Sequence, residues 1–220
     1  MPLNKDQLVQ LYRKRARHYD FTANLYYLIG FREWSYRKKA VAALNLKEGD
    51  TVVEIGCGTG LNFSLLESAI GPEGKIIGVD LTDRMLDQAR QRVVREGWSN
   101  VELVHTDAAS YDFLPGTNGI ISTFALTLVP EYDNVVRRGA SALAAGGRWV
   151  VADFKLPEGW TARLTPLFEP LVRPFGATLD IAHRHPWESM QKYLKNVTME
   201  EFFLGFTYIA MGEAPGHSLP

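Results

Sequence analysis

The chain has little cysteine, no long apolar run and almost no net charge, and each shortage excludes a class of protein. Its 220 residues include one cysteine, Cys57, which rules out a disulfide framework within the chain and leaves no cysteine-rich zinc or redox motif. The longest weakly polar run, residues 119–130, is far shorter than the roughly 20 apolar residues of a membrane-spanning helix. Residues 4–7 are polar where a signal peptide would be apolar, so we expect a cytoplasmic protein.

The charges are unevenly distributed even though they nearly cancel. Residues 1–40 hold nine Lys or Arg against three Asp or Glu, a balance of +6, so a net charge of −1 leaves −7 for the remaining residues. This asymmetry indicates either a solvated helix face or a segment that meets an anionic partner, such as a lipid surface or an acidic substrate. A pI near 6.5 and the lack of another basic, aromatic-rich segment argue against a nucleic-acid partner.

Apolar and helical segments alternate after a helical N-terminal region. The predicted strands are residues 51–55, 75–80, 101–105, 119–124 and 148–154, and the predicted helices are residues 61–70, 82–96 and 134–145. Glycines that commonly end helices, such as Gly97, mark the boundaries. The alternation predicts an α/β fold with a parallel sheet and crossover helices. Beyond Lys155, prolines punctuate a segment that we expect to face the substrate, before a closing strand.

Three alternating glycines follow the first predicted strand. The sequence Gly56-Cys57-Gly58-Thr59-Gly60 runs directly into a helix, whose open N–H groups form a polar cradle that a ligand can approach closely. A dinucleotide-binding fingerprint would need glycine at position 61, which is Leu61. The spacing therefore argues against a nicotinamide cofactor.

Carboxylates end the first two predicted strands and follow the third. Glu54, Asp80 and Asp107 all lie at the carboxyl edge of the expected sheet, where open α/β sheets bind their ligands. Asp80 is placed to accept both ribose hydroxyls of an adenosine, and Asp107 is placed to accept an adenine amino group. Three acids in register with the glycine loop favour a binding site over isolated helix caps.

This set of motifs resembles the class I S-adenosylmethionine-dependent methyltransferases, with 144–147 (Ala-Ala-Gly-Gly) as a further match. The resemblance implies a Rossmann-like, mostly parallel sheet of seven strands with helices on both faces. Its last two strands would be residues 197–201 and 205–211, the final one antiparallel. The cofactor implied is S-adenosyl-L-methionine, converted to S-adenosyl-L-homocysteine. No metal is expected, since His183 and His185 lack a nearby acidic or cysteine partner.

The same resemblance implies a role for each residue of the site. The loop from Gly56 through Cys57 and Gly58 to Gly60 would pass under the methionine moiety. Glu54 would steady its amino group and Asp80 would hold the ribose. The other contacts would be Leu81 and Met85 against the adenine, Asp107 and Ala108 at its edge, and the Thr123 backbone near the sulfonium.

Residues 4–19 predict an amphipathic helix with an aromatic, apolar face and a basic face. It is expected to act as a lid, as a membrane-surface element, or as both. In similar methyltransferases a tyrosine beside an aspartate in this segment contacts the cofactor, which implies a positioning role for Tyr19. Tyr26 and Tyr27 would line the acceptor site.

We expect one domain over residues 1–220: a lid over 1–45, a cofactor-binding core over 46–155, and an acceptor side over 156–220. The segment around His185 looks like that of bacterial phosphatidylethanolamine N-methyltransferases and betaine-lipid head-group enzymes, which places His185 on the acceptor side. Quinone C-methyltransferases are similar over the first 155 residues. The favoured acceptor is an amine-bearing lipid head group, with C- or O-methylation of a quinol or small aromatic as the alternative. A catalytically inactive cofactor-binding module is a further alternative, and the oligomeric state stays open.

Overall fold

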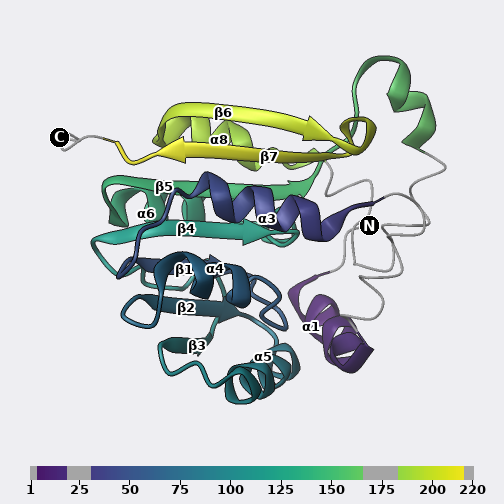
Figure 1. The fold of residues 1–220 in the computed structure, drawn as a ribbon. Helices are drawn as coiled ribbons and strands as arrows, with labels where there is room; N and C mark the ends of the chain where they lie inside the picture. The colour runs from purple at the N-terminus through teal and green to yellow at the C-terminus, as the bar shows by residue number, and fades with distance from the viewer. Residues whose placement is uncertain (1–3, 19–30, 166–182, 216–220) are drawn as a thin grey trace.

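The computed structural model describes residues 4–18, 31–165 and 183–215, and its centre is a seven-stranded sheet (Figure 1). The strands are β1 (Thr51–Ile55), β2 (Lys75–Asp80), β3 (Val101–His105), β4 (Thr117–Thr123), β5 (Leu143–Phe154), β6 (Lys195–Phe202) and β7 (Thr207–Glu213). Their order across the sheet is β3-β2-β1-β4-β5-β7-β6. All pairs are parallel except those of β7, which runs antiparallel to β5 and β6. The predicted seven-stranded Rossmann-like sheet with an antiparallel last strand is therefore confirmed.

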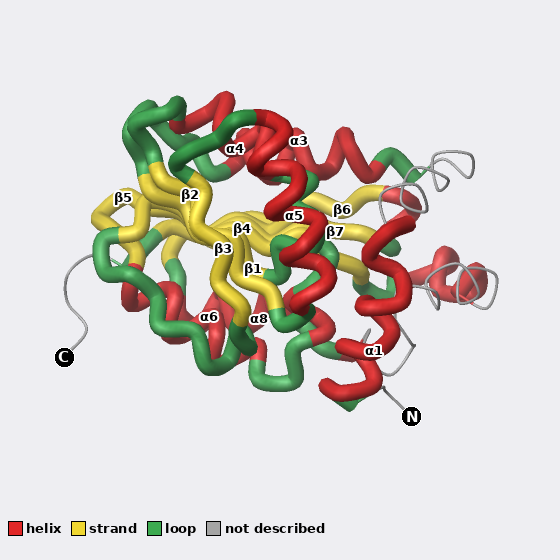
Figure 2. The backbone as a smooth tube through the Cα atoms, turned by 90° about the horizontal axis from the view of Figure 1, so that it is seen from below, coloured by secondary structure: helices red, strands yellow, loops and turns green. Residues whose placement is uncertain are grey.

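Helices cover both faces of this sheet. Figure 2 shows α3 (Glu33–Ala43), α4 (Phe63–Ile70) and α5 (Asp83–Glu96) on one face, and α6 (Tyr132–Ala142) and α8 (Pro186–Tyr193) on the other. Successive side chains of β1 enter opposite hydrophobic clusters, Val52 under α3 and α4 and Val53 under α6, because side chains alternate across a strand. Helix α1 (Lys5–Arg15) lies beyond the carboxyl ends of the parallel strands, followed by the short η1 (Ala16–His18). No helix in these described ranges has the length and apolar character needed to cross a membrane.

The predicted bounds of β1, β2 and β3 are confirmed, but those around β5 are wrong. The helix predicted to reach residue 145 ends at Ala142, and β5 begins at Leu143 rather than Arg148. The chain enters the sheet early because Leu143 pairs with Thr117, and a register shift then precedes the pairing of Arg148 with Gly119. Gly146, at φ +77°, permits that irregularity, since glycine adopts positive φ without steric cost.

The closing strands also differ from the prediction: β6 is longer than the predicted residues 197–201, and β7 lies two residues further along the chain than the predicted 205–211. Between them the short η7 (Phe203–Gly205) turns the chain, and Phe203 and Leu204 both adopt positive φ. Strand β4 starts two residues earlier than predicted and ends at Thr123, because Phe124 leaves it with φ +56°.

Candidate functional site

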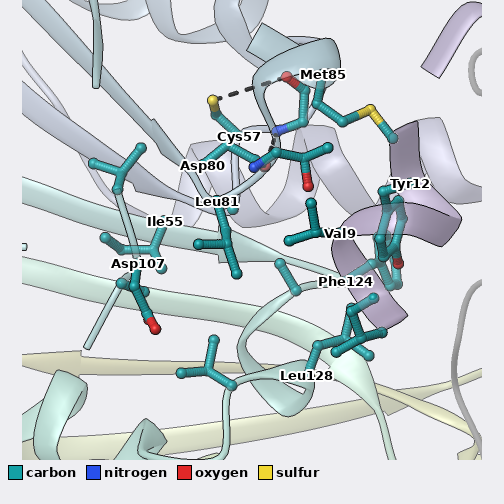
Figure 3. A pocket seen from close by; sticks show the side chains of 18 of the residues that line it. Val9, Tyr12, Ile55, Cys57, Asp80, Leu81, Met85, Asp107, Phe124 and Leu128 are labelled. Atoms are coloured by element: carbon teal, nitrogen blue, oxygen red, sulfur yellow. Dashed lines mark hydrogen bonds between the residues drawn. The ribbon is translucent and has the colours of Figure 1, made fainter. Parts of the chain in front are cut away.

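A pocket opens where the parallel strands end, beneath α1 (Figure 3). It lies at the ends of β1, β2 and β4, next to the point where successive strands begin to add on the opposite side of β1. Open α/β sheets bind ligands at such a reversal of strand order. The structure brings together nine residues that the sequence predicted for the site: Gly56, Cys57, Gly58, Asp80, Leu81, Met85, Asp107, Ala108 and Thr123.

The loop after β1 can only be built from glycine at two of its positions. Gly56 has φ +70°, and a Cβ there would lie 2.3 Å from the Cβ of Ala125. Gly60 has φ +76°, and its Cβ would lie 2.5 Å from the ring of Phe63. Gly60 packs against α4 and is not among the residues that line the pocket. These two glycines thus let the loop backbone pack closely against Ala125 and Phe63.

Asp80 ends β2 and holds the neighbouring loops in place. Its Oδ2 accepts the Gly58 N–H at 2.9 Å, and its Oδ1 accepts the Thr82 N–H at 2.8 Å. Burial raises the pKa of this carboxyl, and the two backbone hydrogen bonds oppose that rise. The Thr82 side chain also bonds this carboxylate, which still has acceptor capacity left for a ligand hydroxyl.

Asp107, after β3, is bonded to the N-terminal helix. Its Oδ1 accepts the Ala109 N–H at 2.9 Å, while its Oδ2 accepts Lys5 Nζ at 2.7 Å. The same Lys5 donates to Glu131 Oε1 at 2.9 Å, so the pKa of Lys5 is raised, first by Asp107 and then by Glu131. No local pattern indicates a role for Lys5, because its partners are more than a hundred residues away in the sequence.

Helix α1 covers the pocket with its apolar face. Leu8, Val9 and Tyr12 line the pocket, and Figure 3 shows Val9 and Tyr12 across it from Asp80 and Leu81. At the other end of the helix, Arg13 makes a paired contact with Asp83, Nε to Oδ1 at 2.7 Å and Nη2 to Oδ2 at 3.1 Å. Part of the basic excess of the N-terminal region therefore meets acidic residues of the same chain.

Glu54 lies under the pocket rather than in its lining. It is 1% exposed, and its Oε1 accepts Asn62 Nδ2 at 2.7 Å. Among the described residues, no donor reaches its fully buried Oε2. Burial raises the pKa of Glu54 to about 8, opposed first by the charge of Arg37 and then by the bond from Asn62.

Arg37 is a site residue that sequence reasoning missed. It belongs to the basic N-terminal segment, which indicated either a solvated helix face or an anionic partner, yet it lines the pocket and is only 5% exposed. Its Nη2 lies 2.6 Å from Glu33 Oε1 and its Nη1 lies 2.6 Å from Thr123 Oγ1. The spacing of four between Glu33 and Arg37 was visible, but the burial follows from the contact with Thr123 on β4.

Residues 1–168 match the ubiE/COQ5 methyltransferase family. The chain belongs to this family. It is therefore an S-adenosylmethionine-dependent methyltransferase, and the resemblance found in the sequence is confirmed. A demethylmenaquinone methyltransferase of Listeria monocytogenes serotype 4a is 28% identical over 182 residues, 79% of this chain and 77% of that protein. One from Geobacillus stearothermophilus is 28% identical over 155 residues, 70% and 65% of the two chains.

Solved structures share the fold of this methyltransferase. A putative methyltransferase of Haloferax volcanii, in complex with the activator Trm112, aligns with a TM-score of 0.70 at 17% identity over 93% and 97% of the two chains. Geranyl diphosphate C-methyltransferase of Streptomyces coelicolor A3(2) aligns with a TM-score of 0.67 at 15% identity, over 83% and 76%. Phosphoethanolamine N-methyltransferase 2 of Haemonchus contortus aligns with a TM-score of 0.61 at 22% identity, over 77% and 39%.

The residues in and beneath the methyltransferase's pocket fit S-adenosylmethionine. The buried Glu54 Oε2, which has no donor from the described chain, suits the ammonium of the methionine moiety. Asp80 keeps acceptor capacity for a ribose hydroxyl, and the apolar side chains of Leu81 and Met85 suit an adenine face. The individual contacts stay predictions.

An aromatic cluster adjoins the pocket of the methyltransferase through Phe124. The centroid of its ring lies 5.6 Å from that of Phe31 and 5.1 Å from that of Phe154. The ring centroids of Phe31 and Phe203 are 5.5 Å apart. Phe124 itself lines the pocket and holds a positive φ, which is uncommon outside glycine and often marks a functional site. Segments far apart in the sequence supply these rings, so no local motif indicated them.

The residues predicted for the acceptor side have different outcomes. Tyr19, Tyr26 and Tyr27 lie outside the described residues. His185 precedes α8, stacks on Trp187 at 4.4 Å and contacts Glu188 Oε1 at 2.8 Å through Nδ1, so the expectation that it lacks a nearby acidic partner is wrong. It is not among the residues that line the pocket, and its side chain makes no capping bond to the helix.

Proposed function

We propose that this methyltransferase moves a methyl group from S-adenosylmethionine to a ring carbon of a quinol-type acceptor. The family and the demethylmenaquinone methyltransferases at 28% identity support this alternative over the amine-bearing lipid that the sequence analysis favoured. The observation that carries it is the position of Phe124, which is both a wall of the cofactor pocket and a member of the aromatic cluster. An aromatic acceptor packed there would lie beside the methyl donor.

Methyl transfer from a sulfonium requires the protein mainly to align the two reactants, rather than to supply a strong acid or base. The sulfonium methyl is already electrophilic, so the protein must hold a nucleophile in line with the carbon–sulfur bond and exclude water. Helix α1 closes the pocket with Leu8, Val9 and Tyr12, which supports water exclusion. A ring carbon becomes nucleophilic when the quinol hydroxyl loses its proton.

A lipid-amine acceptor is the second candidate, supported by the shared fold with the phosphoethanolamine N-methyltransferase. Both acceptors suit a cytoplasmic enzyme that works at a membrane surface. Lys14 and Arg17 are exposed on α1 and η1, so they are available to anionic head groups while the apolar face covers the pocket. In this proposal residues 1–45 form the lid, 46–155 the cofactor-binding core and 156–220 the acceptor side, with Tyr26, Tyr27 and His185 toward the acceptor.

The test is transfer of labelled methyl from S-adenosylmethionine into a total lipid extract under reducing conditions, followed by separation of quinones from phospholipids. Label in the quinone fraction, retained on the ring after degradation, supports the proposal. Label in the phospholipid head group, recovered as a methylated amine after acid hydrolysis, overturns it in favour of the second candidate. Label in neither fraction, with cofactor binding shown separately, overturns both acceptors.

A further inference from the structure

A chain of buried polar side chains runs from α3 to the end of β1. Arg37 donates through Nε and Nη2 to Glu33 Oε1 at 2.8 and 2.6 Å. It donates through Nη1 to Thr123 Oγ1 at 2.6 Å and to Asn62 Oδ1 at 3.2 Å. Asn62 then donates through Nδ2 to Glu54 Oε1 at 2.7 Å and to Thr123 Oγ1 at 3.0 Å. The network therefore links a pocket residue to the carboxylate beneath the pocket.

Arg37 determines which way the Asn62 amide faces. A guanidinium has donors and no acceptor, so only the amide oxygen can face it. The amide nitrogen must then face Glu54, as the distances show. Without Arg37 the amide could turn over and present its oxygen to Glu54, which would oppose ionisation of that carboxyl.

When Glu54 is ionised, the described part of the network has two carboxylates and one guanidinium, so one negative charge is not balanced. Two carboxyl groups, Glu33 and Glu54, feel the charge of the single guanidinium of Arg37, and that guanidinium contacts Glu33 directly. Glu54 Oε2 is fully buried and receives no donor from the described part of the chain. A buried carboxylate needs a cation or a hydrogen bond to stay charged, and the methyl donor carries an ammonium group.

We infer that Arg37 is a positioning residue for the methyl donor. Arg37 orients the Asn62 amide and so keeps Glu54 ready to accept the donor's ammonium group. The inference concerns the methyl donor alone, so it holds for either acceptor. Its failure would leave the acceptor assignment standing, and the labelling experiment would be unaffected by it.

The arrangement makes binding depend on pH. Glu54 is surrounded by Arg37 from α3, Asn62, the Asp80 carboxyl at the end of β2 and the Cys57 thiol, with Glu33 acting through Arg37. Because burial raises the pKa of Glu54 to about 8, the free protein holds a proton there at neutral pH. An incoming ammonium would displace that proton, so binding should tighten as the pH rises toward 8.

The experiment is calorimetric titration with S-adenosylhomocysteine from about pH 6 to about pH 8.5, in buffers of different ionisation enthalpy that report proton release. Arg37→Met should weaken binding about tenfold at neutral pH. It should also raise the midpoint of the pH dependence of binding by about one pH unit, because the Arg37 charge that lowers the pKa of Glu54 is lost. Glu33→Gln removes the negative charge that offsets Arg37, so it should lower the midpoint of the pH dependence of binding. Glu54→Gln should abolish the proton release.

Arg148→Met is the matched control, because Arg148 is a partly buried arginine that pairs with Glu213 at 3.0 Å and does not line the pocket. It should leave affinity and pH dependence unchanged, and thermal unfolding of each variant separates misfolding from loss of binding. The ligand's own ammonium titrates identically with every variant, so differences between variants report on the protein. If Arg37→Met does not fold, the downward shift in Glu33→Gln carries the test. Weaker binding with an unshifted pH dependence in both variants would assign Arg37 a merely structural role and overturn the inference.

Discussion

At the scale of single residues, the tightest constraint on the pocket lies at Gly56. An alanine there would be strained at φ +70° and would press its Cβ to 2.3 Å from the Cβ of Ala125, which also lines the pocket. We expect Gly56→Ala to lower the free energy of unfolding by about 3 kcal/mol, from left-handed strain and overpacking together.

The matched control is Gly116→Ala, which has φ +83° and open space around the new Cβ. It should cost about 1 kcal/mol from strain alone. Urea unfolding of the two variants checks the difference. Equal costs would show that the contact with Ala125 does not constrain the loop.

The buried carboxyl of Glu54 should make the free protein less stable as the pH rises. Its pKa in the folded state is about 8 against an ordinary value of 4.5, so the folded protein keeps a proton that the unfolded chain has released. Stability therefore falls between these two values and levels off above pH 8. From about pH 6.5 to 8.5 we expect wild type to lose about 1–2 kcal/mol more than Glu54→Gln does.

Urea unfolding at several pH values in the absence of cofactor measures this difference. Asp153 has the same sign, but its pKa is raised only to about 6, so its contribution is complete before this range begins. Parallel curves for wild type and Glu54→Gln would contradict the assignment of a protonated Glu54.

At the scale of elements, α1 is held over the pocket by ion pairs at both ends. Lys5 contacts Asp107 and Glu131, and Arg13 contacts Asp83, with side chains that are between about a fifth and a half exposed. Partly exposed pairs are individually weak, so the lid is held shut by a modest free energy. The double variant Lys5→Met/Arg13→Gln should release bound S-adenosylhomocysteine about fivefold faster.

Stopped-flow dissociation in low and high salt checks the role of these pairs. Salt should speed release from wild type more than from the double variant, because the screened ion pairs are already absent in the variant. Lys14→Gln, which removes an exposed charge of the same helix, should leave the rate unchanged. An unchanged rate in the double variant would show that α1 does not limit release.

Local sequence patterns predicted most strands and helices. They failed where contacts between distant residues determine the bounds of an element or the burial of a side chain. The strand from Thr51 to Ile55 and the glycine loop after it could be read directly, since hydrophobic patterning and turn chemistry are local. The start of β5 could not, because Leu143 joins the sheet through its pairing with Thr117. The burial of Arg37 depends on Thr123, 86 residues further along the chain, and charge alone favours a solvated side chain.

At the scale of the whole molecule, the sheet order converts three separate acids into one site. Strands β1, β2 and β3 are neighbours and parallel, so their carboxyl ends meet at one edge. Asp80 and Asp107 therefore line one pocket with the glycine loop, while Glu54 lies beneath it. The sequence predicted this convergence from topology, whereas the aromatic cluster around Phe124 joins segments whose contacts no pattern announces.

The central claim is that this pocket holds the methyl donor, and calorimetric titration of S-adenosylhomocysteine into Asp80→Asn tests it most directly. The amide keeps one acceptor for the backbone but loses the charge, so we expect affinity to fall by about 1.5–3 kcal/mol, or about 10- to 150-fold. Asp50→Asn is the control, because Asp50 likewise accepts a backbone N–H, that of Lys47 at 2.7 Å, and does not line the pocket. It should bind as wild type does. Unchanged affinity in Asp80→Asn, with the protein folded, would contradict the assignment of the pocket.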